Sequence, residues 1–186
     1  MKKINKIRFK IMRLLLYSII FYFTTLSVTA QNKPISDDAF ICYNFALAMD
    51  KKGNYERAVT NFLKAYELDS SYSDVFKLIG LTYLKAYKFK DAIPYFEKAI
   101  EIKPDTVESY MNLGNAYYSL KDYKNAIKYY EKAIEINSEH RSAYRNIGNA
   151  YYSIHNNEKY LENFKKAARL GDIEIQNWLR TNGHSW

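Results

Sequence analysis

Four asparagines form the most distinctive polar pattern of this sequence. Asn112 and Asn115 are three residues apart, and Asn146 and Asn149 repeat that spacing later in the chain. Residues three apart lie on the same face of an α-helix, so each pair presents two side-chain amides together. An amide offers two hydrogen-bond donors and an acceptor oxygen, which can pair with both groups of a peptide backbone whatever its sequence. The pattern predicts a surface that binds an extended peptide through its main chain.

Residues for catalysis or metal binding do not cluster in the sequence. The three histidines, His140, His155 and His184, are scattered, and none has a Cys or His partner at metal-ligand spacing. The sequence has neither a glycine-rich phosphate loop nor a Gly-x-Ser-x-Gly motif. Its acidic residues fall at predicted turns or on outer helix faces, where solvated side chains are expected. We therefore expect no enzymatic activity, no metal and no cofactor.

The asparagine pairs belong to a repeat of about 34 residues. Three similar segments, FKLIGLTYL, YMNLGNAYY and YRNIGNAYY, lie at 76–84, 110–118 and 144–152. Each is followed by a second similar segment, at 91–104, 125–138 and 159–172, and a weaker copy of both lies at 42–50 and 57–70. The predicted repeats are therefore 39–72, 73–106, 107–140 and 141–172.

Apolar spacing predicts two helices in each repeat. In the third repeat the first apolar stripe is Tyr110, Leu113, Gly114 and Tyr117. A second stripe, after a polar turn, is Ala126, Tyr130 and Ala133. A glycine inside a helix costs about 1 kcal/mol, so its return at the same place in three repeats needs a packing reason. The missing Cβ of Gly114 and the small side chain of Ala126 predict that two helices approach closely there.

These positions resemble the tetratricopeptide repeat family, whose pattern is a large residue, Leu-Gly, Tyr, Ala, an aromatic residue, Ala and a closing Pro. The second repeat matches the pattern at Phe76, Ile79, Gly80, Tyr83, Ala92, Phe96, Ala99 and Pro104. The resemblance implies an all-α fold, a right-handed α-solenoid of four helix-turn-helix units in which the first helix of each pair lines a concave groove. Residues 173–186 are expected to form a capping helix and tail, with Trp178 and Leu179 over the end of the stack.

The outer repeats depart from the family pattern. The first has Ala46 in place of the glycine, and the fourth has Tyr160 where a small residue is expected. We expect the large side chain of Tyr160 to splay or shift the two helices of the fourth repeat. Cys42, the only cysteine, has no partner for an internal disulfide, and its place in the first repeat predicts a small buried core residue.

The groove residues follow from the helical rotation of about 100° per residue. With the buried stripe centred on the glycine, the opposite face includes the residues two before it and one after it. The residues at these positions are Asn44, Leu47, Leu78, Leu81, Asn112, Asn115, Asn146 and Asn149. The predicted groove is therefore graded: its N-terminal half is apolar, with Phe40 beside Leu47, and its C-terminal half carries amides.

The family resemblance suggests how these residues are used. Similar asparagine ladders grip extended peptides in the tetratricopeptide region of O-GlcNAc transferase. Asparagine is also close to the family norm at these sites, so contacts between repeats are an alternative role for Asn112 and Asn146. Chaperone-adaptor members clamp a C-terminal carboxylate, and only Lys77 and Asn112 match that clamp. Arg145 can supply one charge for an acidic partner.

The net charge of +8 comes mainly from the N-terminus. Six of the 28 basic residues and none of the 20 acidic residues lie in the first thirty positions. The remaining 22 basic residues nearly balance the acidic ones. We therefore expect no nucleic-acid partner.

The first thirty residues have the parts of a secretory signal peptide. A basic stretch ends at Arg13, residues 14–28 are uncharged, and Val28-Thr29-Ala30 places small side chains where a signal peptidase cuts. We expect residues 1–30 to be removed after Ala30, which leaves 31–38 as a short leader. The alternative is a retained membrane anchor, but a helix of this uncharged length spans about 22 Å of a hydrocarbon core about 30 Å thick.

Together these features predict a non-enzymatic interaction module, exported to the periplasm or the extracellular space, that binds an extended protein or peptide segment in its groove. Contact with the membrane is expected only transiently, through the signal segment. The alternative is a scaffolding or assembly subunit of an envelope complex that uses the convex face or the ends of the solenoid. The oligomeric state stays open.

Overall fold

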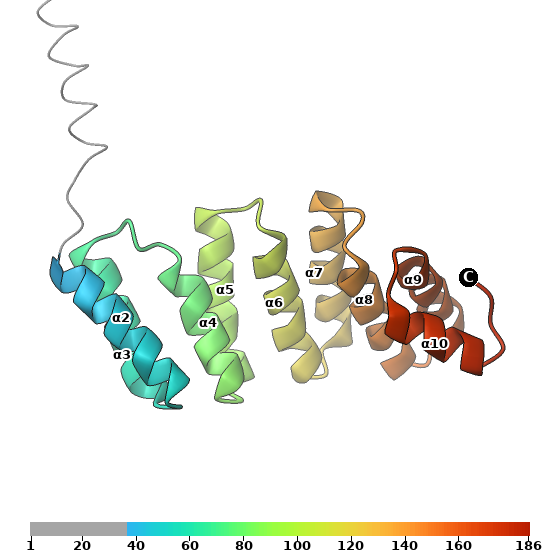
Figure 1. Ribbon diagram of the computed structural model, residues 1–186, viewed down its shortest axis with the longest axis horizontal. Helices are drawn as coiled ribbons and strands as arrows, with labels where there is room; N and C mark the ends of the chain where they lie inside the picture. The colour runs from blue at the N-terminus through green and yellow to red at the C-terminus, as the bar shows by residue number, and fades with distance from the viewer. Residues whose placement is uncertain (1–36) are drawn as a thin grey trace, which may run out of the picture. The chain divides into compact units, whose positions relative to one another are not determined.

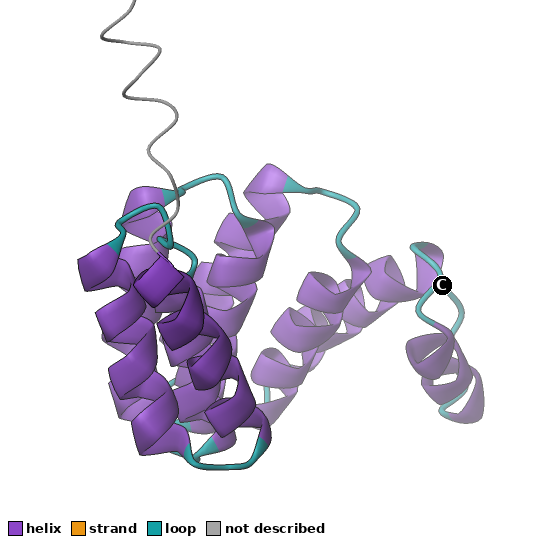
Figure 2. Cartoon of the chain, turned by 60° about the vertical axis from the view of Figure 1, so that its left-hand side comes forward, coloured by secondary structure: helices purple, strands orange, loops and turns teal. Residues whose placement is uncertain are grey.

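The computed structural model describes residues 37–186. The predicted signal segment, its cleavage after Ala30 and residues 31–36 of the leader lie outside this range. All regular elements in the described range are α-helices (Figure 2). They are α2 (Asp37–Lys51), α3 (Tyr55–Leu68), α4 (Val75–Lys85), α5 (Phe89–Ile102), α6 (Val107–Ser119), α7 (Tyr123–Ile136), α8 (Arg141–Ser153), α9 (Asn157–Arg169) and α10 (Ile173–Thr181). The fold is all-α, as the repeat pattern predicts.

The helices form four pairs that follow one another in chain order (Figure 1). α2 packs with α3, α4 with α5, α6 with α7 and α8 with α9, and the second helix of each pair also packs against the next helix along the chain. The turns inside the pairs lie along the lower side of Figure 1, and the connections between pairs lie along the upper side. This arrangement is an α-solenoid, in which each unit contacts mainly its neighbours.

A bare glycine backbone against an aromatic ring fixes the spacing of three helix pairs. A Cβ added to the glycine would lie 2.5 Å from the ring in the pairs Gly80–Phe96 and Gly114–Tyr130, and closer still in Gly148–Phe164. The three rings are buried. Side-chain atoms essentially never come this close, so only glycine permits the contact. In the first pair Ala46 replaces the glycine and packs in one core with Phe62.

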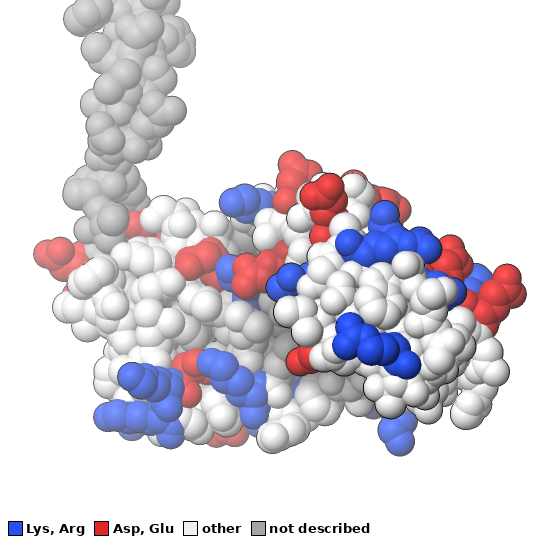
Figure 3. All heavy atoms as spheres, turned by 45° about the vertical axis from the view of Figure 1, so that its right-hand side comes forward, with Lys and Arg blue, Asp and Glu red and all other residues white. Residues whose placement is uncertain are grey.

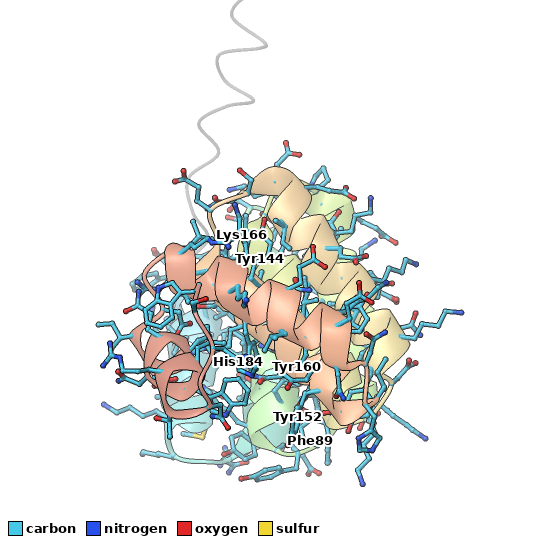
Figure 4. All side chains as sticks on the ribbon, turned by 90° about the vertical axis from the view of Figure 1, so that its right-hand side faces the viewer. Phe89, Tyr144, Tyr152, Tyr160, Lys166 and His184 are labelled. Carbon is cyan, nitrogen blue, oxygen red and sulfur yellow. The ribbon has the colours of Figure 1, made fainter. Side chains whose placement is uncertain are left out.

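The expectation that Tyr160 would splay the fourth helix pair is wrong. Gly148 meets the ring of Phe164 as closely as the glycines of the other pairs meet theirs. The ring of Tyr160 instead packs edge-on against Tyr152, with centroids 5.4 Å apart (Figure 4). It also lies edge-on to Trp178, with centroids 6.1 Å apart. The large side chain therefore packs against aromatic residues of α8 and α10 and leaves the spacing of the two helices unchanged.

The last helix, α10, covers the end of the stack as predicted. Leu179 is fully buried and Ile175 nearly so, in one core with Phe164 of α9. The ring of Trp178 lies edge-on to Phe164 with centroids 5.3 Å apart. The side chain of Asp172 accepts a hydrogen bond from the backbone N–H of Ile175 and so caps the start of the helix. Apolar surface at the end of the array is thereby covered.

The four turns inside the helix pairs share one backbone conformation. Gly53, Tyr87, Lys121 and His155 occupy the same place in successive repeats and have φ values of 76°, 58°, 62° and 58°. In the third turn the N–H of Lys121 donates to the carbonyl of Tyr118, and the N–H of Asp122 donates to that of Tyr117, both at 2.9 Å. This is the helix-ending arrangement in which glycine is favoured. Three of the four turns hold a side chain in the left-handed region.

One further sequence expectation concerns Cys42. Cys42 is buried in α2, as expected of a small core residue, and its thiol is free. Between residues 37 and 186, none of the helices has both the length and the apolar character needed to span a bilayer.

We predict that Gly114→Ala lowers the free energy of unfolding by about 2 kcal/mol, because the new methyl group overlaps the ring of Tyr130. The loss should occur although alanine is the better helix former by about 1 kcal/mol. Urea unfolding followed by circular dichroism measures the difference. In a Tyr130→Leu background, which lacks the ring, Gly114→Ala should stop destabilising the protein. An equal loss in both backgrounds would refute the contact as the cause.

We predict that Lys121→Gly stabilises the protein by about 0.5–1 kcal/mol, because it relieves the cost of a side chain at positive φ. The matched control is Lys128→Gly inside α7, which should destabilise by about 1 kcal/mol because glycine is a poor helix former. Thermal and urea unfolding of both variants give the two signs. A loss of stability in both would show that position 121 carries no strain.

Candidate functional site

Three of the predicted groove amides converge on one cavity. Asn115 comes from α6, and Asn146 and Asn149 come from α8. Tyr118 of α6 and Tyr130 of α7 complete the lining of the cavity, which has a volume of about 230 Å³. The first helices of the third and fourth repeats thus bring these amides together. The second helix of the third repeat contributes the phenol of Tyr130.

Asn115 is the centre of the hydrogen bonding in this cavity. Its Oδ1 accepts from the hydroxyl of Tyr130 at 2.8 Å and from Nδ2 of Asn146 at 3.2 Å. Burial raises the pKa of Tyr130, so its hydroxyl keeps its proton and acts as the donor. Both acceptor positions of the Asn115 oxygen are therefore occupied. Its Nδ2 has no hydrogen-bond partner among the described residues.

Asn149 is the least restrained of the amides that line the cavity. Neither its Oδ1 nor its Nδ2 has a hydrogen-bond partner among the described residues. Its backbone carbonyl accepts from the hydroxyl of Ser153 at 2.9 Å, and that hydroxyl lies 3.4 Å from the phenol oxygen of Tyr118. The hydroxyl of Ser153 thus connects the backbone of Asn149 with the phenol of Tyr118. The side-chain amide of Asn149 stays available as donor and acceptor.

Asn112 does not join this cavity. Its Nδ2 is buried and has no hydrogen-bond acceptor in the described part of the chain. The equivalent amide of the next repeat, Asn146, donates to Asn115 of the repeat before it. The equivalent of Asn115 in the second repeat, one period earlier, is Leu81. Asn112 therefore finds no amide oxygen in the repeat before it. Of the two roles left open by the sequence, Asn146 therefore makes a contact between repeats, and Asn112 lacks the partner for one.

The apolar half of the predicted groove is divided between exposed and half-buried residues. Leu78 and Leu81 of α4 pack against neighbouring core clusters and are half-buried. Phe40 and Leu47 of α2 are exposed, at 56% and 38%. Asn44 is exposed as well, but its Nδ2 donates to the carbonyl of Phe40 in its own helix at 2.9 Å. The exposed apolar surface of this half therefore lies on α2.

The two basic residues of the predicted site form ion pairs that link neighbouring units. Nζ of Lys77 lies 2.9 Å from a carboxylate oxygen of Glu108. The guanidinium of Arg145 lies 3.5 Å from Asp172 and 2.5 Å from Glu174. Arg145 therefore has its charge satisfied within the chain. Opposite charges 29–31 residues apart were the available sequence signal for these links.

A hydrogen bond at the same repeat position joins the first two repeats. The hydroxyl of Tyr43 donates to Asp74 at 2.8 Å. Burial and this hydrogen bond raise the pKa of Tyr43 to about 12. Tyr43, Lys77 and Arg145 occupy the same position in their repeats, so each uses it to reach the unit that follows.

The side chains that line the cavity are amides and phenols, which can donate and accept hydrogen bonds. Within residues 37–186 no group of His, Cys, Asp and Glu side chains is arranged to hold a metal ion. His140 accepts a hydrogen bond from the N–H of Ala143 and caps α8, and His184 stacks on Trp178. These two imidazoles therefore have structural contacts away from the cavity.

Comparison with known proteins agrees with the fold. Models of the tetratricopeptide repeat match residues 41–72, 88–121 and 107–140. The last of these is the range that the spacing predicts for the third repeat. The match at 88–121 joins α5 to α6, which shows that a second helix and the next first helix also resemble a repeat unit. No curated protein matches the chain.

Solved structures of MamA are similar to this chain. MamA from Desulfovibrio magneticus RS-1, residues 41 to the end, is 25% identical with a TM-score of 0.66, over 73% of this chain and 76% of that one. MamA from MSR-1 is 24% identical with a TM-score of 0.64, over 75% of this chain and 80% of that one. The helix pairs, the glycine–ring contacts and the matching repeat models agree: the chain is a tetratricopeptide repeat protein.

Proposed function

We propose that this chain holds an extended segment of another protein in its groove, with the cavity between α6 and α8 as the anchoring point. The repeat matches and the similar solved structures support the broader statement that it is a protein–protein interaction module. Its chemistry is binding without catalysis. We infer the location of the bound segment from the side chains that line the cavity.

The observation that carries this proposal is the set of unpaired polar groups in the cavity. The amide of Asn149 and Nδ2 of Asn115 have no hydrogen-bond partner among the described residues. A peptide main chain supplies the missing partners, because its carbonyl accepts from an Nδ2 and its N–H donates to Oδ1 of Asn149. Neither contact depends on the identity of the peptide side chains.

The cavity is partly ordered before a ligand arrives. Tyr130 and Asn146 both donate to Oδ1 of Asn115, so Nδ2 of Asn115 has a fixed direction. A site whose side chains are already oriented loses less conformational entropy on binding. Tyr118 lines the same cavity. Its aromatic ring offers a contact for the part of the peptide next to the bound main chain.

Export to the periplasm or the extracellular space is part of the proposal. It rests on the basic stretch that ends at Arg13, the uncharged residues 14–28 and the small residues before Gln31. The described residues contain one cysteine, and its thiol is buried, so packing alone maintains the solenoid.

A scaffolding role is the second candidate, and one observation favours it. Phe40, Ile41, Phe45 and Leu47 of α2 are between 38% and 62% exposed. They lie on the first helix of the array, where a terminal face with a polar surface is usual. Contact with another protein at that end would bury them.

We predict that Asn149→Ala weakens peptide binding about tenfold, because it removes two hydrogen bonds worth about 1 kcal/mol or less each. Peptides selected from a random displayed library with the wild-type chain serve as probes, and fluorescence anisotropy gives the affinities. The matched control is Asn177→Ala on the exposed face of α10, which should bind like the wild type. Unchanged affinity for Asn149→Ala would refute the cavity. Binding lost instead on Phe45→Ser would favour the scaffolding surface of α2.

We predict a different result for Asn115→Ala, which should lower the free energy of unfolding by about 1–3 kcal/mol. The substitution removes the acceptor of the Tyr130 hydroxyl, and a buried donor without a partner is costly. Asn149→Ala should leave the stability within about 0.5 kcal/mol of the wild type, since it breaks no contact in the fold. Urea unfolding of the two variants tests the assignment of which amide is structural. Equal losses of stability would overturn it.

We predict that the protein recovered from a cell envelope fraction begins at Gln31. Edman sequencing or intact mass measurement detects the cut, and replacing Ala30 by a large residue, Ala30→Trp, should block it because the peptidase pocket takes small side chains. An uncut chain in the membrane fraction would favour the retained anchor.

A further inference from the structure

The charges of the described residues are balanced in number and separated in space. Residues 37–186 contain 21 basic and 20 acidic side chains. The four turns inside the helix pairs, 51–57, 85–91, 119–125 and 153–159, which we call the turn edge, contain nine Lys or Arg and four Asp or Glu. The four connections after the pairs, 67–75, 101–108, 135–141 and 169–174, which we call the connection edge, contain ten Asp or Glu and three Lys or Arg.

The two edges lie on opposite sides of the solenoid. In Figure 1 the turns inside the pairs follow the lower side and the connections follow the upper side. In Figure 3 basic side chains gather at the lower left rim, and acidic side chains prevail along the upper rim. Each turn joins the C-terminal end of one helix to the N-terminal start of the next, so the helix dipoles largely offset one another. Side-chain charge therefore decides the sign of each edge.

Some of these charges are free to act on a neighbour, whereas five of the ten carboxylates of the connection edge pair with a lysine or arginine of the same chain. Lys85 pairs with Asp50, and Nζ of Lys88 lies 3.4 Å from Glu56. Other lysines of the turn edge, namely Lys51, Lys52, Lys90, Lys121 and Lys124, have no ion pair with a carboxylate among the described residues. The same holds on the connection edge for Glu67, Asp105 and Glu139. All of these side chains are exposed.

Both edges also expose apolar side chains. On the turn edge Tyr87 is 82% exposed and Ile154 is 48% exposed. On the connection edge Leu68, Ile102 and Ile136 are 38–40% exposed, and they recur at the repeat period. Burying such groups against one another adds a short-range attraction to the electrostatic one.

We propose that the turn edge of one copy binds the connection edge of a second copy. Both edges belong to the same repeats, so their charges have the same spacing along the array. A sideways translation of one copy then places basic turns opposite acidic connections in neighbouring repeats. A contact between two different surfaces of one chain does not close on itself, so the product is an open row of molecules. The cavity between α6 and α8 lies on neither edge and stays accessible within the row.

The physical character of the contact makes it dependent on salt. Exposed ion pairs are individually weak, so the row depends on many of them acting together. Charges on exposed side chains are screened beyond about 3 Å in 1 M salt and beyond about 30 Å in 0.01 M salt. We expect association that rises with protein concentration at low ionic strength and disappears at high ionic strength.

Charge reversal tests the pairing of the two edges. The turn-edge variant carries Lys52→Glu, Lys90→Glu and Lys124→Glu, and the connection-edge variant carries Glu67→Lys, Asp105→Lys and Glu139→Lys. Sedimentation velocity measures association at low and high salt. The sample is the full chain as it is purified from the cells that produce it. Each variant alone should reduce the association constant at least tenfold. The chain with all six reversals should regain part of it, because the reversed positions of the two edges again carry opposite charges.

The controls separate the location of the charges from their number. The control variant carries Lys64→Glu, Lys128→Glu and Lys165→Glu. Its net charge changes as much as that of the turn-edge variant, but the three positions lie on second helices away from the turns. The control variant should associate like the wild type. Circular dichroism confirms that each variant is folded. A wild-type chain that stays monomeric at low salt overturns the proposal, as does a six-residue variant without recovery. Binding of the monomer, through the turn-edge lysines, to vesicles of phosphatidylcholine and phosphatidylglycerol would assign that edge to an anionic lipid surface. That result would overturn the proposal as well.

Discussion

The contact between a glycine backbone and an aromatic ring sets the geometry on which the remaining structure depends. In the third repeat the ring of Tyr130 lies directly on Gly114. This contact fixes the distance between two helices and also directs the hydroxyl of Tyr130 to Asn115, the next residue along the chain from the glycine. One side chain therefore holds the core together and orients an amide of the cavity. The equivalent rings of the second and fourth repeats are phenylalanines, Phe96 and Phe164, which do only the first of these tasks.

The links between neighbouring repeats explain why the candidate site consists of amides. Tyr43, Lys77 and Arg145 sit at one repeat position, and each pairs with an acidic side chain of the unit that follows. The charges of Lys77 and Arg145 are used within the chain, so a carboxylate ligand has no free cation at this position. Asn149 has no such role and keeps its full hydrogen-bonding capacity. The polar groups left for a ligand are thus neutral, which suits a peptide main chain better than a charged terminus.

The sequence was sufficient for the fold because the repeat period carries its own physical reason. A glycine that recurs inside helices requires close packing, and the structure shows the ring that packs there. The effect of Tyr160 was misjudged because the pattern gives its position but not the direction of its ring, which depends on Tyr152 and Trp178. Helical rotation placed Asn115 and Asn149 on a common face. It could not show that Asn112 lacks an acceptor, since that depends on a neighbour in another repeat.

The candidate site arises where the repetition breaks, and the two charged edges arise where it is kept. Leu81 and Asn115 hold equivalent positions, yet only Asn115 offers an oxygen to the next repeat. A perfectly regular array would therefore have several equal cavities or none, whereas in the described part of this chain Asn115, Asn146 and Asn149 line a cavity together. Charge behaves in the opposite way, because lysines near each turn and carboxylates near each connection add up along the stack. A net charge close to zero in the described residues thus conceals a separation of charge between the two edges. The electrostatic character of a solenoid follows from the position of its charges within the repeat.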